Sequence, residues 1–321
     1  MKQLLRISLA VLATALLAGC GDRADAVAHD VQVPRNSIYH WKTVFDIDST
    51  ELSFLQKHDI DRVYLRMFDV AMEQDFLNGV LDIVPIATTR FNSPIPAGVE
   101  IVPVTYITID ALRAMVGREQ EFASLILERL LAMASHNGCG EIKEIQLDCD
   151  WTATTKDIYN RLCEAVKGAL SANGIELSIT VRLHQLQETP PPADKGVLMV
   201  YNTGTLKNRE TCNSILHIDN VKPYLKETKY PIPLDHAYPV FGWGVKFKDN
   251  KFVSIVSYDH TDISDDEFVR FERASSPEVL AVKELVEQTI GKPANGNILY
   301  HLDHSQFKHY TDNEISQILS Y

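Results

Sequence analysis

Residues 144–152 have the sequence EIQLDCDWT, and this stretch decides the fold. From residue 145 to residue 150, apolar and polar residues alternate strictly, which predicts a β-strand with one apolar face and one polar face. Asp148 and Asp150 lie two residues apart and therefore point to the same side. Because neighbouring like charges raise the pKa of at least one carboxyl, such a pair indicates a binding or catalytic site rather than a stabilising feature.

Strand patterns alternate with amphipathic helix patterns on both sides of this stretch. Apolar spacing predicts long helices over residues 118–137 and 154–172. The predicted strands cover residues 37–45, 62–69, 100–109, 144–150, 175–184, 196–202, 233–241 and 297–303. Eight such units predict a single-domain (β/α)8 barrel of the TIM type. We prefer the barrel to an open doubly wound sheet, because strands in such a sheet are almost continuously apolar, whereas several here have an inward polar set.

Two segments interrupt the regular alternation. Residues 80–99 contain three prolines and predict an irregular excursion. Residues 245–258 predict a hairpin that turns at Asp249 and Asn250. A helix is expected to follow from Ser264, because Glu267 stands three residues later, in capping-box spacing.

The N-terminus has the pattern of an export signal. Lys2 and Arg6 precede an apolar run over residues 7–17, which is too short to span a bilayer. The following sequence LAGC, at residues 17–20, resembles a bacterial lipobox, and this resemblance implies cleavage before Cys20 and lipid attachment to its thiol. The expected divisions are a signal peptide (1–19), a lipidated cysteine and tether (20–36) and the barrel (37–321). An ordinary secretory signal is the alternative.

Composition excludes several classes of protein. The formal net charge is −12, and an acidic chain lacks the basic surface that nucleic acids or anionic lipids require. The expected membrane contact is therefore the lipid alone, at the bacterial cell envelope. Besides Cys20 there are four cysteines and no C-x-x-C pair, so no metal site or cofactor is predicted. We expect the remaining cysteines to pack in the core, with disulfides as the alternative.

In a (β/α)8 barrel the working site lies at the C-terminal ends of the strands. The polar and aromatic residues expected there combine carboxylates, cations and ring faces, which suits sugar recognition. The catalytic candidates are Asp148, Asp150, Tyr201, Asp235 and Asp303. The candidates for glycan binding are Trp41, Arg66, Arg182, His184, Asn202, His236, Trp243 and His301.

Two of these motifs resemble a known family. Residues 146–152, QLDCDWT, resemble the strand-four signature D-x-D-x-E of family 18 chitinase-like barrels, and residues 199–202, MVYN, resemble their strand-six M-x-Y-D. The run from residue 148 to residue 180 also resembles exported bacterial barrels described as glycoside-hydrolase-like. The resemblance implies a glycan as ligand or substrate. The sequence departs from the family pattern where the general acid, a glutamate, is replaced by Thr152, and where the strand-six aspartate is Asn202.

Threonine cannot protonate a leaving oxygen, so hydrolysis would need another acid. We expect Asp150 to fill that role, kept protonated by Asp148, with Asp235 or Asp303 as the second carboxylate and Tyr201 orienting the reacting centre. An alternative is a non-catalytic barrel that serves as a binding or assembly component of an envelope complex.

Plainer interpretations of the same residues remain open. Asp148 and Asp150 could pair with Arg66 and Arg182 in a structural ion network. Histidines at the strand ends could hold a metal with Asp303, although the H-x-H of metal-dependent amidohydrolases is absent from the first strand. The three tryptophans could serve packing, with Trp243 on a glycine-flanked loop as the best exposed ring.

Overall fold

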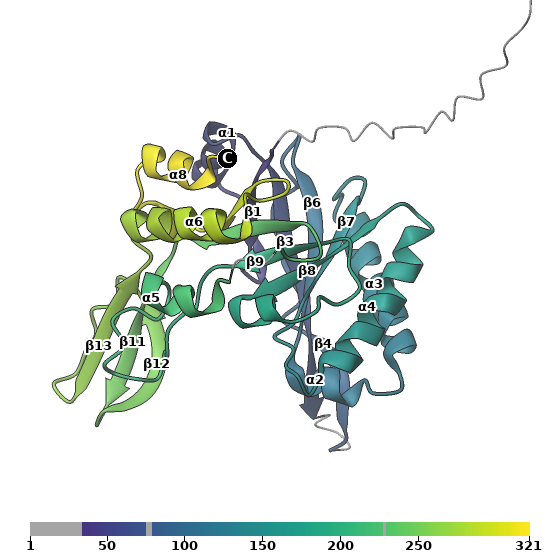
Figure 1. Cartoon of the computed structure of the whole chain (residues 1–321), viewed down its shortest axis with the longest axis horizontal. Coiled ribbons are helices and arrows are strands. Elements are labelled where there is room, and N and C mark those ends of the chain that lie inside the picture. Colours follow the sequence, from purple (N-terminus) through teal and green to yellow (C-terminus); the bar gives the residue numbers. More distant parts are fainter. Residues whose placement is uncertain (1–33, 75–78, 227–228) are drawn as a thin grey trace, which may run out of the picture. The chain divides into compact units, whose positions relative to one another are not determined.

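The computed structural model describes residues 34–74, 79–226 and 229–321. The predicted N-terminal signal and Cys20 lie outside these residues. Eight parallel strands form a closed barrel, because the first strand pairs with both the second and the last (Figure 1). The barrel strands are β1 (Asn36–His40), β3 (Ile60–Gln74), β6 (Glu100–Ile107), β7 (Glu144–Asp148), β8 (Glu176–Arg182), β9 (Lys195–Met199), β10 (Leu234–Pro239) and β14 (Asn297–Tyr300). The predicted (β/α)8 fold is confirmed.

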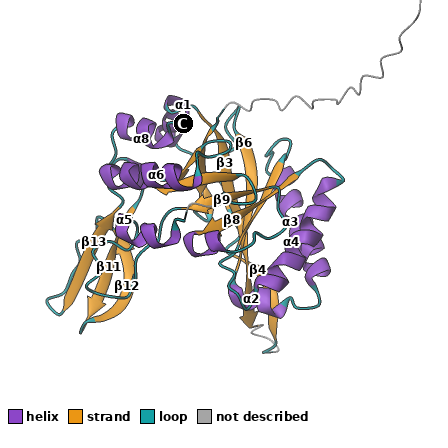
Figure 2. Cartoon of the chain, in the orientation of Figure 1, coloured by secondary structure: helices purple, strands orange, loops and turns teal. Residues whose placement is uncertain are grey.

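The helices between the strands vary in length (Figure 2). They are α1 (Ser49–Lys57), α2 (Ile109–Ala114), α3 (Glu119–His136), α4 (Lys156–Ser171), α5 (Ile218–Val221), α6 (Ser276–Ile290), α7 (His304–Phe307) and α8 (Asp312–Leu319). Short 3-10 turns, η1 (Leu183–Gln187) and η2 (Lys222–Tyr224), follow β8 and α5. No helix in the described part of the chain is both long enough and apolar enough to cross a membrane.

The stretch that predicted the fold forms β7 in the expected orientation. Its apolar set faces the surrounding helices, where Cys149 lies in the main core with Cys163 of α4. Its polar set faces the barrel interior, where Gln146 accepts a hydrogen bond of 2.7 Å from the Tyr39 hydroxyl. The four cysteines at 139, 149, 163 and 212 are free, and all except Cys212 are buried. The expectation of core packing is therefore confirmed for three of them.

Two sequence predictions are wrong. The excursion over residues 80–99 contains β4 (Leu81–Ile86), which pairs antiparallel with the end of β3, and β5 (Arg90–Phe91), which pairs with β2 (Val44–Phe45). The helix expected from Ser264 is instead strand β13 (Glu267–Arg273). Glu267 does accept the Ser264 backbone N–H, but the contact closes only a turn. The residues that follow pair along the predicted hairpin, and this tertiary pairing decides their conformation.

The hairpin itself is confirmed. Strands β11 (Gly242–Lys248) and β12 (Lys251–Ser257) turn at Asp249 and Asn250, both of which have positive φ. With β13 they form a three-stranded sheet in the order β12-β11-β13. Two consecutive residues with positive φ are typical of the tight turns that match the twist of a hairpin.

His236 on β10 is a buried histidine that faces away from the barrel axis, towards α6. Burial lowers the pKa of its imidazole to about 3. Between that value and the ordinary pKa of about 6.5, the unfolded chain binds a proton that the folded chain does not, so stability falls as pH falls. Between pH 7 and pH 5 we expect wild type to lose about 2 kcal/mol more unfolding free energy than His236→Leu.

Urea unfolding at the two pH values measures this difference. His136→Leu is the control, because that side chain is exposed on α3, and it should keep the wild-type pH dependence. Equal losses in wild type and His236→Leu would contradict the assignment.

Candidate functional site

One face of each strand lines the barrel interior. The inward side chains at the C-terminal ends of the strands form the mouth of the barrel. Tyr39 and Tyr64 stack with their ring centroids 4.9 Å apart in an inner cluster with small apolar side chains. Trp41, Tyr201 and Tyr300 pack against this cluster from the C-terminal side. The mouth of the barrel therefore has an aromatic floor.

Arg182 at the end of β8 holds the two aspartates that follow from β7. Its Nη2 donates to Asp148 Oδ1 at 3.0 Å, and its Nε donates to Asp150 Oδ1. Thr180 on the same strand donates to Asp148 Oδ1 at 2.5 Å. The parallel pairing of β7 with β8 brings these residues together, since Leu147 lies opposite Ile179 and the side chains beyond that pair face inward.

The two aspartates differ in exposure. The side chain of Asp148 is 4% exposed and that of Asp150 is 46% exposed. Burial raises the pKa of the Asp148 carboxyl, while Arg182 and Thr180 oppose the rise. The Asp150 carboxylate has a guanidinium partner and is open to solvent. Arg182 lies between the two carboxylates, so they do not face each other as the expectation that Asp148 keeps Asp150 protonated requires.

A second arginine and aspartate form a similar pair at the mouth. Arg66 on β3 donates to Asp69 through Nε at 2.7 Å and through Nη2, so the ion pair is bidentate. The same guanidinium lies 5.6 Å from the centre of the Trp41 ring and donates to its backbone carbonyl. The predicted ion network therefore forms in part: Arg182 binds Asp148 and Asp150, whereas Arg66 binds Asp69.

A cavity of about 350 Å³ opens beside the Arg182 cluster. The lining residues come from the ends of β7, β8 and β9 and from the following loops: Asp150, Arg182, Leu183, His184, Met199, Tyr201, Asn202, Thr203 and Tyr224. His184 and Asn202 are exposed and available for hydrogen bonds. Five residues predicted for the site thus lie on one cavity.

Tyr300 belongs to the same site, although it is not among the residues predicted for it. Its ring stacks on Tyr201 with a centroid distance of 4.4 Å and lies 5.9 Å from the centroid of Trp41. Burial raises the pKa of both tyrosine hydroxyls, so both remain protonated donors at neutral pH. Tyr224, whose ring is partly exposed, is a further cavity residue that was missed. It lies in the 3-10 turn η2, where no strand pattern marks it.

Asp235 and Asp303 do not join Asp150, so neither carboxylate pair expected for hydrolysis exists. Asp235 is near the start of β10, where it accepts from Asn295 and neighbours Lys195 and Glu144. Glu144 lies at the start of β7, four residues or roughly 13 Å of strand before Asp148, and Asp150 lies beyond that end. Asp303 instead caps α7 by accepting from the Ser305 backbone N–H.

The remaining predicted residues also lie away from the cavity. His301 faces outwards from the barrel, and burial lowers the pKa of its imidazole to about 4. Trp243 is half-buried on β11, where its indole N–H donates to the buried Glu272, so it is not an exposed ring on a loop. In the described residues, no three histidine, cysteine or acidic side chains are placed to hold a metal ion.

No protein-family model matches the chain, and no curated protein sequence matches it. Solved structures do match over most of its length. The spore cortex-lytic enzyme SleL of Bacillus cereus has 15% identity and a TM-score of 0.53, over 90% of this chain and 75% of that one. A chitinase from Chromobacterium violaceum has 12% identity and a TM-score of 0.53, over 86% and 97%. The GH18 chitinase ChiB of Flavobacterium johnsoniae has 10% identity and a TM-score of 0.53, over 89% and 94%. At these identities the likeness shows the fold: a (β/α)8 barrel similar to those of chitinase-like proteins.

Proposed function

We propose that the mouth of the barrel binds a glycan and does not hydrolyse it. The observation that carries this proposal is that all three aspartates of the mouth are bound by arginine. Asp148 and Asp150 share Arg182, and Asp69 is paired with Arg66. General acid catalysis of glycoside cleavage needs a carboxyl that carries a proton and reaches the leaving oxygen. In each of the three aspartates, at least one carboxylate oxygen accepts from a guanidinium and is not free to carry a proton to a leaving oxygen.

The cavity has the groups that sugar recognition uses. Aromatic rings of Tyr201 and Tyr224 offer faces for a pyranose, while Asp150, Asn202 and His184 can accept or donate hydrogen bonds to hydroxyl groups. A volume of about 350 Å³ lies at the small end of the range of about 300 to 1,000 Å³ found for ligand pockets, which suits one or two sugar units. The similarity of the fold to chitinase barrels supports the same ligand class.

Hydrolysis is the second candidate, because burial raises the pKa of Asp148. Asp148 does not line the cavity, however, and its Oδ1 is taken by Thr180 and Arg182. The side chain of Thr152, at the position where the resembling family has its acid, hydrogen-bonds to the hydroxyl of the neighbouring Thr154. We therefore favour binding.

Asp150→Asn tests the role of the cavity carboxylate. The change removes the charge and keeps the shape, so glycans that bind wild type should bind the variant about tenfold more weakly. Calorimetry on a panel of neutral and N-acetylated oligosaccharides measures the effect. Asp157→Asn, which changes an exposed aspartate on α4, should bind like wild type. The proposal fails if no oligosaccharide binds saturably, or if Asp150→Asn binds as tightly as wild type.

We also propose that lipid on Cys20 anchors the chain in a bacterial cell envelope, on the basis of the lipobox resemblance. Cys20→Ala should move the protein from the membrane fraction to the soluble fraction after cell disruption. Cys212→Ala removes an exposed cysteine within the barrel domain and should leave the protein in the membrane fraction. Retention of Cys20→Ala in the membrane fraction would refute the anchor.

A further inference from the structure

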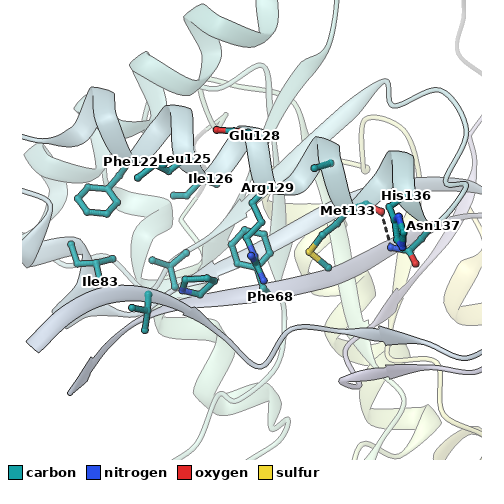
Figure 3. Close-up of a pocket in the computed structure, with 14 residues that line it drawn as sticks. Phe68, Ile83, Phe122, Leu125, Ile126, Glu128, Arg129, Met133, His136 and Asn137 are labelled. Carbon is teal, nitrogen blue, oxygen red and sulfur yellow. Dashed lines mark hydrogen bonds between the residues drawn. The ribbon is translucent and has the colours of Figure 1, made fainter. Parts of the chain in front are cut away.

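A groove of about 730 Å³ lies on the outside of the barrel (Figure 3). It runs between α3 and the pair of strands β3 and β4. It shares no lining residue with the cavity beside Arg182. The glycan proposal therefore does not explain it.

The groove exists because the barrel departs from its regular pattern at this point. A (β/α)8 barrel places a helix after each strand, and that helix covers the outside of the sheet. Between β3 and β6 the described residues form strands β4 and β5 and no helix. The C-terminal part of β3 pairs with β4 instead of leading into a helix, and the groove lies between these two strands and α3.

The walls of the groove are apolar. Figure 3 shows Phe122, Leu125, Ile126 and Met133 of α3 on one side and Phe68 and Ile83 on the other. Leu125 is 50% exposed, so the apolar wall continues to the surface. A groove of this volume lies well within the range of about 300 to 1,000 Å³ of small-molecule sites.

A single guanidinium lies in the middle of this apolar surface. Arg129 occupies the position on α3 that continues the stripe from Phe122 through Ile126 to Met133, and Figure 3 shows its side chain reaching down to Phe68. The guanidinium carbon lies 5.1 Å from the centre of the Phe68 ring. An arginine in an apolar stripe places a fixed positive charge inside the groove.

Arg129 has few partners for that charge. Its Nη2 donates to the Thr88 hydroxyl at 3.0 Å, and within the described residues no carboxylate lies within 4.0 Å. Its Nε is buried and has no hydrogen-bond partner among the described residues. A guanidinium carries five N–H donors, so most of its donors remain free for an anion. Glu128, the adjacent acid, also lines the groove but forms no ion pair with Arg129 within 4.0 Å.

We propose that this groove binds a long-chain carboxylate, that is, a free fatty acid. Apolar walls match a hydrocarbon chain, and the unpaired guanidinium matches a carboxylate head group. The charge complementarity is specific to the groove, because the chain as a whole is acidic, with a formal charge of −12, and would repel anions elsewhere.

Calorimetry with dodecanoate, below the concentration at which it forms micelles, tests the site in the full barrel domain. We expect saturable binding at one site. Arg129→Gln should weaken it about tenfold, because a charge-assisted hydrogen bond is lost. Arg113→Gln is the control: it removes an exposed arginine of α2 that pairs with Asp110 and does not line the groove, and it should bind like wild type.

Two further measurements separate the head group from the chain. Dodecanol should bind wild type about as weakly as dodecanoate binds Arg129→Gln, and butanoate should not bind measurably. Leu125→Glu, at an exposed position that tolerates a polar side chain, should weaken dodecanoate binding through both charge and lost apolar contact. The proposal is refuted if dodecanoate does not bind saturably, if Arg129→Gln and Arg113→Gln bind it equally, or if dodecanol binds as tightly as dodecanoate.

Discussion

Arg182→Met is expected to lower the free energy of unfolding by about 3 kcal/mol, because the substitution leaves Asp148 buried without its cation. Methionine has a similar length and keeps most of the packing of the arginine stem, so the loss reports the charge. Thr180 would remain as a hydrogen-bond donor to Asp148, and it cannot neutralise the carboxylate. Urea unfolding followed by circular dichroism measures the change.

The double variant Asp148→Asn with Arg182→Met separates this cause from a loss of packing. The asparagine removes the unpaired charge of Asp148 and should recover more than half of the lost free energy of unfolding. Arg113→Met is the control, since that arginine forms an exposed pair with Asp110 and should change stability by less than about 1 kcal/mol. If Arg182→Met were as stable as Arg113→Met, the bridge would not hold the mouth together.

Gly296→Ala is expected to destabilise the barrel by about 3 kcal/mol, through steric overlap. A Cβ at residue 296 would lie 2.2 Å from the carbonyl oxygen of Arg35, which is backbone and has little freedom to move. The residue also has a φ of +151°, which side chains rarely adopt. The backbone N–H of residue 35 donates to the backbone carbonyl of residue 295, and these residues directly precede β1 and β14. The clash therefore falls where the last strand pairs with the first.

Gly98→Ala is the matched control. Residue 98 also has a positive φ, of +81°, but no atom lies within 4 Å of the added Cβ. It should lose only about 1 kcal/mol, the strain of the backbone itself. Equal losses at the two positions would show that the contact with Arg35 contributes nothing. Thermal and urea unfolding of both variants decide the matter.

The sequence predicts the barrel well because most strands have a clear inside and outside. On β7 and β8 the strict alternation places Asp148, Thr180 and Arg182 on the inner face, where the structure also has them. The strands after β8 are less clear. On β14 the inner residues are Ile298 and Tyr300, so His301 falls on the outer face.

The error at β14 has a physical reason. Residues 297–303 have aromatic, apolar and polar side chains on both faces of the strand. The outer face packs in the main core together with Phe307, and the inner face forms part of the aromatic floor. Period-two reasoning cannot distinguish two faces that are both buried. The same applies to β10. Asp235 faces the barrel interior near the N-terminal end of the strand, away from the mouth, and His236 packs on the outside of the barrel.

The bridge made by Arg182 could not be predicted in detail either. The sequence shows that an arginine and two aspartates share the inner face, and it allows either repulsion between the aspartates or pairing with a cation. Only the register of β7 against β8 decides which, because it puts the guanidinium between both carboxylates. Because Arg182 contacts both aspartates, we propose a binding site and not an acid catalyst.

The most direct test of the central claim is a single assay of wild type on a labelled oligosaccharide panel that records binding and release of reducing ends together. We predict saturable binding of at least one oligosaccharide, with release no faster than in buffer alone. Release that rises with protein concentration would contradict the claim that the arginine-bound aspartates cannot act as an acid.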